Sequence, residues 1–181
     1  MTFRLLMRRI NAIPRIRGIH VVRAYMKNSR KPYSDRTDLE KLQSQWWKLS
    51  GLHSREEWSA AVVRAATAAE IAANIAIRQE FQAIGSFPPK FVDSLLIWAN
   101  GLKGKLERLL VPITKDTDHG KVISGLKSLA IDVNDIRNAI AHKGEFCSEK
   151  KAKEVIAKSQ EFIEGVVSLY EAGFKLKERK P

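Results

Sequence analysis

The chain has 181 residues, of which 44% are hydrophobic and 29% charged, a composition typical of a soluble domain with a sizeable core. The single cysteine, Cys147, excludes an intramolecular disulfide and a cysteine-rich zinc site, and we expect a cytoplasmic protein. No uninterrupted apolar run approaches the roughly 18–20 residues that span a bilayer, so we expect no membrane association.

The net charge of +12 is concentrated at the N-terminus. Residues 1–34 contain nine basic residues and no acidic one, whereas the remaining positions contain 23 basic and 20 acidic residues. We therefore predict a basic, poorly ordered arm over residues 1–35, followed by one helical domain over residues 36–175. The arm also has the composition of a tail that attracts nucleic acid, or of an organelle transit peptide.

Capping patterns mark the first helices after this arm. Thr37 and Glu40 form a capping box, which predicts a short leading helix. Ser54 and Glu57 form a second capping box, which predicts a long helix over residues 55–83. The middle of this helix is rich in alanine, so neighbouring helices can approach it closely.

Prolines and glycines punctuate the next stretch. Pro88 and Pro89 predict the first turn of a third helix, which is interrupted before a short continuation that reaches about Leu110. Residues 111–121 predict a loop. The apolar positions of the third helix recur at helical spacing and predict its buried face: Phe91, Leu95 and Trp98.

Two further helices complete the predicted fold. The first covers residues 121–143 and has a clear apolar stripe, and the second follows the capping residue Ser148 and covers residues 149–172. Strand signals are almost absent. The sequence therefore predicts an all-α protein, an antiparallel bundle of four main helices with a short leading helix and a basic N-terminal arm.

Polar side chains cluster near the end of the helix over residues 121–143. Asn134, Asn138 and His142 recur every four residues and form one stripe, with Arg137 on a neighbouring line. Arginine binds phosphate oxygens through its planar fork, and histidine exchanges protons near neutral pH. Because Arg137 and His142 are five positions apart, they diverge by roughly 140° on an ideal helix. The long arginine side chain, a loosened last turn or a dimer partner would be needed to bring them together.

The spacing alone is not specific, because Arg15 and His20 repeat it within the N-terminal arm. That copy lies between a proline and a glycine and has no helical context. The copy at residues 137–142 follows a predicted helix and precedes a glycine and a capped helix. This context favours a function for the second copy.

The segment RNAIAHKG resembles the signature of the HEPN domain superfamily, which is an Arg, a polar residue and then a His four to six positions after the Arg. The order of helices over residues 55–172 is also similar to that family. The resemblance implies a helical bundle that dimerises, with Arg137, Asn138 and His142 in the active site and with neither metal nor cofactor. Many members are ribonucleases of toxin–antitoxin or phage-defence systems, and others only bind nucleic acid or proteins.

One position departs from a subgroup of that family. Members paired with nucleotidyltransferase antitoxins have a tyrosine two positions after the motif histidine, and that tyrosine is modified. This chain has Gly144 there. We therefore do not expect regulation by nucleotide addition at this position.

Other polar and aromatic residues have a structural and a functional interpretation. Glu70 is the only acid in the alanine-rich segment and is the candidate partner of Arg137, either in support of the site or as a plain salt bridge. A solvent-exposed Glu70 is the alternative. Asn134 is a candidate supporting residue, or a structural polar group that either faces solvent or pairs two helices. The tryptophans either stack on nucleobases or anchor the core: Trp46, Trp47, Trp58 and Trp98.

These observations predict a homodimeric endoribonuclease that cleaves RNA by attack of a 2′-hydroxyl at a site on the dimer interface. The product ends would be a 2′,3′-cyclic phosphate and a 5′-hydroxyl, and an antitoxin or regulatory protein is a further expected partner. A non-catalytic helical module for dimerisation or nucleic-acid binding is the alternative. A regulator similar to the mannitol-repressor group, on general similarity around residues 91–144, is a third.

Overall fold

The structure is a computed structural model that describes residues 31–178. The chain divides into two parts after Asp35, and each is considered by itself. Among its described residues, the first part contains a single 3-10 turn, η1 (Tyr33–Asp35). Most of the predicted basic arm, residues 1–30, lies outside the described residues.

The second part is helical, and no strand occurs within residues 31–178, which confirms the predicted all-α class. Its elements are α2 (Asp38–His53), α3 (Trp58–Ile84), α4 (Pro89–Trp98), α5 (Gly101–Lys105), η2 (Leu106–Leu110), α6 (Val111–Thr114), α7 (Asp118–Lys143) and α8 (Glu149–Val167).

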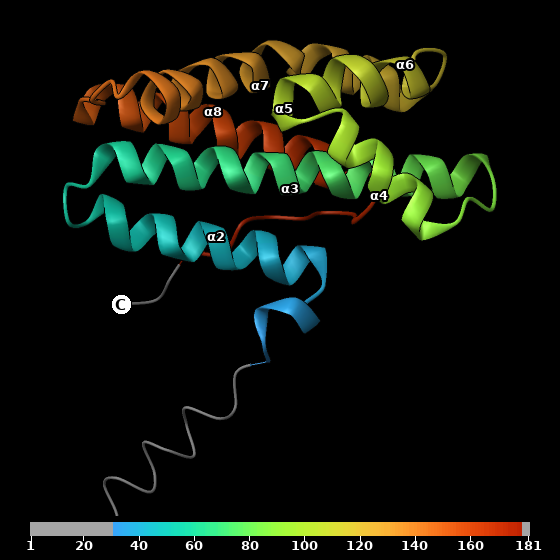
Figure 1. Cartoon of the computed structure of the whole chain (residues 1–181), viewed down its shortest axis with the longest axis horizontal. Helices are drawn as coiled ribbons and strands as arrows, with labels where there is room; N and C mark the ends of the chain where they lie inside the picture. Colours follow the sequence, from blue (N-terminus) through green and yellow to red (C-terminus); the bar gives the residue numbers. More distant parts are fainter. Residues whose placement is uncertain (1–30, 179–181) are drawn as a thin grey trace, which may run out of the picture. The chain divides into compact units, whose positions relative to one another are not determined.

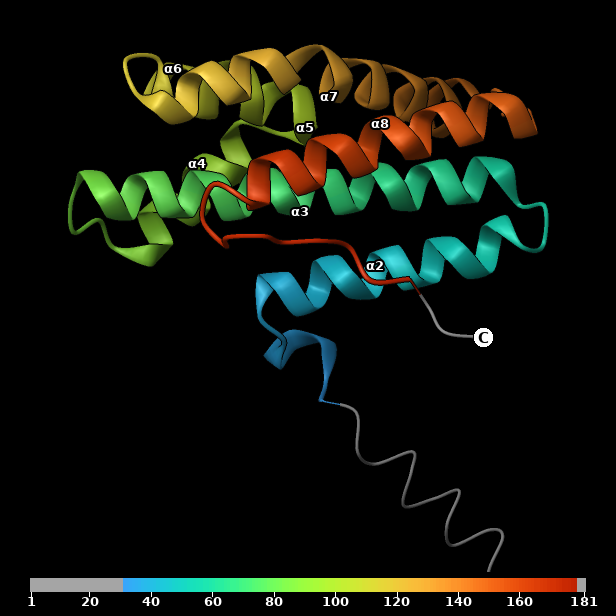
Figure 2. The same cartoon turned by 180° about the vertical axis from the view of Figure 1, so that it is seen from behind.

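Helix α3 is the centre of this part of the molecule. It packs against α2, α7 and α8, and the α5–η2 segment lies against both α3 and α7 (Figures 1 and 2). Chain neighbours run antiparallel in the pairs α2–α3 and α7–α8, whereas α3 and α8 run in the same direction (Figure 1). As predicted, alanines line the buried faces of α3: Ala61, Ala65, Ala66, Ala68, Ala69, Ala72, Ala73 and Ala76.

By length and composition α3 would also be long enough and apolar enough to cross a membrane. However, 61% of its most apolar window is buried inside the bundle, as in the core helix of a packed domain.

Several predicted helix starts are confirmed. The capping box of α2 is complete, since the Thr37 hydroxyl accepts a hydrogen bond from the Glu40 N–H and the Glu40 carboxylate accepts one from the Thr37 N–H. Pro89 lies in the first turn of α4, where its missing N–H removes no helical hydrogen bond. The Ser148 hydroxyl caps α8 by accepting from the Lys151 N–H.

The predicted capping box at Ser54 and Glu57 is wrong. Helix α2 continues through His53, and the Ser54 hydroxyl donates to the Gly51 carbonyl at the end of that helix. The chain then turns at Glu56, whose φ of 61° lies in the left-handed region, and α3 begins at Trp58 without a side-chain cap. Ser54 therefore closes α2 and does not open α3.

The predicted loop over residues 111–121 is also wrong. Helix α6 continues directly from η2, and α7 begins at Asp118, where the Thr117 hydroxyl accepts from the Gly120 N–H. The loop is thereby reduced to a short turn between two helices. At the other end of the domain, α8 stops at Val167, before the predicted end near residue 172.

The predicted buried face of α4 is wrong for two of its three residues. Val92 and Leu96 are buried and Leu95 is half-buried against the core, whereas Phe91 is 45% exposed and Trp98 is 59% exposed. Apolar residues occupy most of the circumference of this ten-residue helix, so the 3.6-residue period does not determine which face is buried.

The segment after α8 returns along the bundle to α2. The Lys177 carbonyl accepts hydrogen bonds from Gln43 Nε2 at 2.9 Å and Trp47 Nε1 at 3.0 Å. The Lys177 N–H donates to Gln43 Oε1 at 3.0 Å, and Leu176 is buried. These contacts fix α2 to the end of the described chain.

A buried carboxylate joins the far end of α3 to two other segments. Glu80 Oε1 accepts a hydrogen bond from the Tyr170 hydroxyl at 2.6 Å and lies 2.7 Å from His119 Nδ1. Burial, then the hydrogen bond to Glu80 and its charge, raises the pKa of Tyr170 well above its ordinary value. Tyr170 therefore stays a hydrogen-bond donor throughout the physiological pH range.

Candidate functional site

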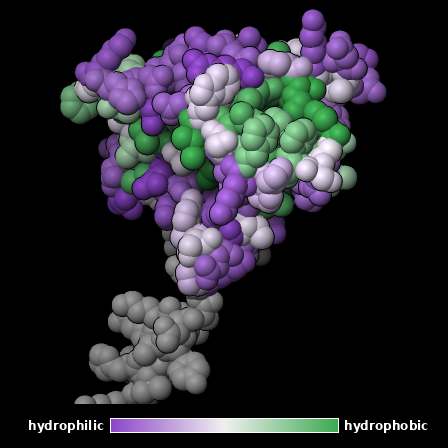
Figure 3. All heavy atoms as spheres, turned by 45° about the vertical axis from the view of Figure 1, so that its right-hand side comes forward, coloured by the Kyte–Doolittle hydropathy of each residue, from purple (hydrophilic) through white to green (hydrophobic). Residues whose placement is uncertain are grey.

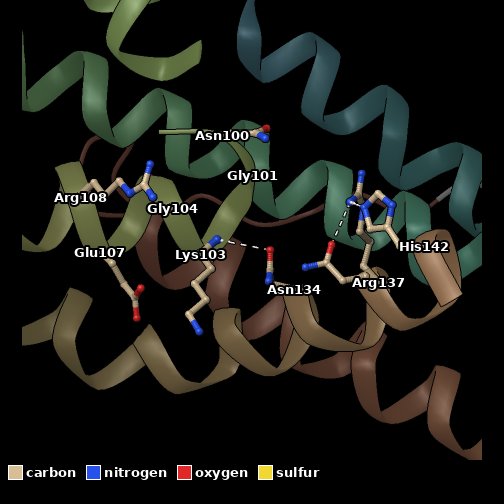
Figure 4. Close-up of a pocket in the computed structure, with 10 residues that line it drawn as sticks. Asn100, Gly101, Lys103, Gly104, Glu107, Arg108, Asn134, Arg137 and His142 are labelled. Atoms are coloured by element: carbon tan, nitrogen blue, oxygen red, sulfur yellow. Dashed lines mark hydrogen bonds between the residues drawn. The ribbon is translucent and has the colours of Figure 1, made fainter. Parts of the chain in front are cut away.

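A polar pocket lies between α7 and the segment that runs from the end of α4 into η2 (Figure 4). Its volume is about 400 Å³, within the range of small-molecule sites. Ten residues line it: Asn100, Gly101, Lys103, Gly104, Glu107, Arg108, Asn134, Arg137, Asn138 and His142. The pocket thus contains the complete motif predicted from the sequence, together with residues from a second wall.

The first wall is the last part of α7. Gly144 ends this helix in the left-handed region with φ of 69°, and its N–H bonds to the Ala139 carbonyl. A residue with a side chain is strained in this conformation, whereas glycine is not. The glycine stop therefore places His142 in the final turn, at the rim of the pocket.

The second wall depends on a close backbone approach at Gly104. A Cβ atom at this position would lie 1.9 Å from the Ala99 carbonyl oxygen, so only glycine lets α5 pass the end of α4 in this way. The two walls are joined by Asn134, which is buried and whose Oδ1 accepts from the Lys103 N–H at 3.4 Å. Asn134 thus pairs two helices, as one of its interpretations predicted.

The turn η2 is of the wide π type and presents Glu107 and Arg108 to the pocket. Pro112 lies just beyond it and lacks the N–H that would bond to the carbonyl four residues earlier, at position 108. A proline ring also clashes with that carbonyl in a regular α-helix. The local widening of the helix follows from this proline, and such π turns are frequent at functional sites.

The motif side chains meet within one chain. Arg137 Nη1 lies 3.2 Å from His142 Nε2 and donates to Asn138 Oδ1 at 2.9 Å. Helix α7 is α-helical through Lys143, so no loosened turn brings the two residues together. The length of the arginine side chain spans the five-residue offset, and this contact requires no second chain.

A guanidinium is a donor only, so His142 Nε2 is the acceptor in this contact. His142 is exposed and Arg137 is half-buried. Asn138 bonds to the guanidinium and thereby holds it in place. Among the described residues, no hydrogen bond joins Asn138 to the imidazole of His142.

The pocket has an excess of positive charge. Its lining contains three permanently basic side chains, Lys103, Arg108 and Arg137, and one acidic side chain, Glu107. Glu107 is partly compensated by Lys127, at 3.7 Å. This arrangement attracts anions.

Glu70 does not support the motif. Its carboxylate pairs with Lys105, whose side chain is buried, on α5. The predicted ion pair with Arg137 is therefore wrong, because α5 lies between α3 and the pocket and supplies a closer cation to this carboxylate. Glu70 instead fixes the base of the second wall.

Sequence patterns did not identify the residues of that second wall: Asn100, Lys103, Glu107 and Arg108. The run GLKGKLER contains basic residues, but its periodicity does not indicate that it faces α7. Within residues 31–178, no group of three His, Cys, Asp or Glu side chains is arranged to hold a metal ion.

Fold and site together define an all-α protein with a basic pocket built around an Arg–His pair. No protein-family model, curated protein or solved structure matches this chain. The HEPN resemblance therefore stays a prediction from residues 55–172 and from the motif.

Proposed function

We propose that the protein is an endoribonuclease in which His142 transfers a proton and Arg137 binds the phosphate. The observation that supports this most directly is the 3.2 Å contact between Arg137 Nη1 and His142 Nε2 at the rim of a basic pocket. A proton acceptor and a phosphate-binding fork thereby lie within the span of one nucleotide linkage.

The reaction follows from these two groups. His142 Nε2 accepts the proton of a ribose 2′-hydroxyl, and the 2′ oxygen attacks the adjacent phosphorus. The bond between phosphorus and the 5′ oxygen breaks, and that oxygen takes a proton from the protonated imidazole or from water. The products are a 2′,3′-cyclic phosphate and a 5′-hydroxyl, and Arg137 stabilises the charge that develops on the phosphate oxygens.

The resting contact has to change when substrate binds. A phosphate offers the guanidinium charged acceptors, which are stronger partners than a neutral imidazole nitrogen. Arg137 then turns toward the phosphate and releases the His142 lone pair for the 2′-hydroxyl. Asn138 keeps one guanidinium N–H bonded throughout, so it acts as a positioning residue.

The test is RNA cleavage in the presence of EDTA by the wild type, His142→Ala, Arg137→Lys and the neighbouring control Lys143→Ala. We expect a loss of roughly 100- to 10,000-fold for His142→Ala and roughly 100-fold or more for Arg137→Lys, which loses the fork but keeps the charge. Lys143→Ala should retain wild-type activity. RNA that is methylated at the 2′ oxygen should remain intact.

Absence of cleavage by the wild type would refute the proposal, as would equal cleavage by His142→Ala. Products with a 5′-phosphate would also refute it, because attack by a 2′-hydroxyl cannot form them.

A non-catalytic interaction module is the second candidate, and the surface of α4 favours it. Large apolar side chains are exposed on this helix and on the segment before it: Ile84, Phe87, Phe91, Ile97 and Trp98. Figure 3 shows a patch of hydrophobic side chains on the face that comes forward in that view. Such a patch is typical of a protein contact, either with a second copy of the chain or with a regulatory protein. This candidate predicts that Phe91→Ala weakens self-association in analytical ultracentrifugation while His142→Ala changes no activity.

A further inference from the structure

Trp98 differs from the other exposed apolar residues because it is joined to the pocket. The Cζ atom of Arg108, a pocket residue, lies 5.2 Å from the centroid of the Trp98 ring. Arg108 Nη1 also donates to the Trp98 carbonyl at 3.4 Å. These two contacts hold the guanidinium against the tryptophan.

Arg108, the pocket member of this pair, lies at the end of the pocket away from the motif. Figure 4 shows Arg108 at one end and Arg137 with His142 at the other, with Lys103 and Asn134 between them. A chain of nucleotides whose phosphate contacts Arg137 would therefore extend past Lys103 toward Arg108.

The chemistry of the pair fits a nucleobase. Trp98 is 59% exposed, so most of its surface remains free although Arg108 covers part of the ring. Unpaired bases stack on aromatic rings and on the planar guanidinium of arginine, whereas bases in a duplex are already stacked and present no free face. An aromatic ring covered by a cation next to a basic pocket matches the sites that bind single strands.

We infer that Trp98 and Arg108 form a stacking subsite for an unpaired nucleobase of the same strand whose phosphate contacts Arg137, so that the preferred substrate is single-stranded RNA. The inference rests on the proposed function for the identity of the strand. The subsite itself is a binding property and is measured without cleavage.

The experiment measures the affinity of the full chain for short 2′-O-methyl oligonucleotides by fluorescence anisotropy, since these cannot be cleaved. Intact oligonucleotides are compared with ones in which a single abasic position is moved along the strand. For the wild type, we expect one abasic position to weaken binding by roughly 5- to 150-fold. The substitution Trp98→Ala should weaken binding of the intact oligonucleotide by a similar factor. The variant should bind the intact and the abasic oligonucleotides with equal affinity.

Two variants and the salt dependence control the interpretation. Trp98→Phe keeps an aromatic face and should retain most of the discrimination. Phe91→Ala removes an exposed aromatic ring on about the same face of α4, two turns from the pocket, and should retain all of it. The slope of affinity against salt should be the same for Trp98→Ala and the wild type, because no phosphate contact is lost.

Equal affinity of the wild type for intact and abasic strands at every position would overturn the subsite, as would discrimination that survives in Trp98→Ala. Unchanged oligonucleotide binding with lost self-association in Trp98→Ala would overturn it in favour of a protein contact. If the wild type discriminates through Trp98 but cleaves no RNA, the subsite stands and the proposed nuclease falls. If the wild type cleaves RNA but does not discriminate between intact and abasic oligonucleotides, the proposed nuclease stands and the subsite falls.

Discussion

Two glycine-to-alanine substitutions should change stability in opposite directions. Gly104 and Gly125 both lie in helices, and alanine is favoured over glycine in a helix by about 0.8–1 kcal/mol. At Gly125 nothing lies within 4 Å of the added Cβ, so Gly125→Ala should gain this amount. At Gly104 the added Cβ would lie 1.9 Å from the Ala99 carbonyl oxygen, which is backbone and cannot rotate away.

The size of the effect at Gly104 follows from that overlap. Overpacking of this kind costs typically 1–3 kcal/mol, and here α4 and α5 have to separate. Because the obstructing atom belongs to the backbone, we take the upper end of this range, about 3 kcal/mol. After subtraction of the gain in helix propensity, about 1 kcal/mol, we expect Gly104→Ala to lose about 2 kcal/mol. For a domain of this size the midpoint temperature should then fall by roughly 4–8 °C, whereas Gly125→Ala should raise it by roughly 2–4 °C.

The assay is urea denaturation followed by far-UV circular dichroism, with thermal melts at the same pH. Separation of α4 from α5 would also displace the Lys103 N–H from Asn134, so RNA cleavage should fall in Gly104→Ala at temperatures where it is fully folded. If Gly104→Ala is as stable as the wild type, or if both variants change in the same direction, the close approach at Ala99 is not what holds the second wall.

Two further predictions concern single groups. Tyr170→Phe removes a hydrogen bond to the charged Glu80, so it should lose roughly 1.5–3 kcal/mol in urea denaturation at pH 8. Because the folded state raises the pKa of Tyr170, its contribution to stability is complete below about pH 10 and decreases as the pH rises further. Wild-type stability should therefore fall more steeply above about pH 10 than that of Tyr170→Phe, and parallel curves would contradict this. Gly144→Ala forces alanine into the left-handed region and should lose about 1–2 kcal/mol in the same assay. Gly144→Asn should lose less, since asparagine tolerates this conformation, and equal losses would mean that φ is not the cause.

The sequence was sufficient to predict the features that depend on a few consecutive residues. The Thr37–Glu40 capping box, the proline at the start of α4, the Ser148 cap and the glycine stop at Gly144 are local, and each follows from hydrogen bonds that the backbone must satisfy. The alanine-rich face of α3 was predictable because small residues permit close helix packing wherever the partner lies.

Features that depend on tertiary contacts were not predictable. Ser54 had the correct spacing to open α3 but closes α2 instead, because the turn at Glu56 intervenes. Glu70 pairs with Lys105 and not with Arg137, since the alanine-rich helix has several neighbours and the sequence does not say which one faces the carboxylate.

The candidate site was predicted only in part for the same reason. The residues Arg137, Asn138 and His142 are close in sequence, and the pocket contains all three. Lys103 and Arg108 come from a segment about 30 positions earlier, and their place opposite α7 depends on the approach at Gly104 and on the wide turn before Pro112.

The bonds between Gln43 and Lys177 have a consequence for the order in which the protein assembles. The two residues are 134 positions apart, so these bonds cannot form on the ribosome until nearly the whole described chain has emerged. Until then Trp47 Nε1 lacks its acceptor, and the surface that buries Leu176 stays open to water. A nascent chain would therefore expose an incomplete α2–α3 hairpin for most of its synthesis, which makes this hairpin the expected contact for chaperones during translation.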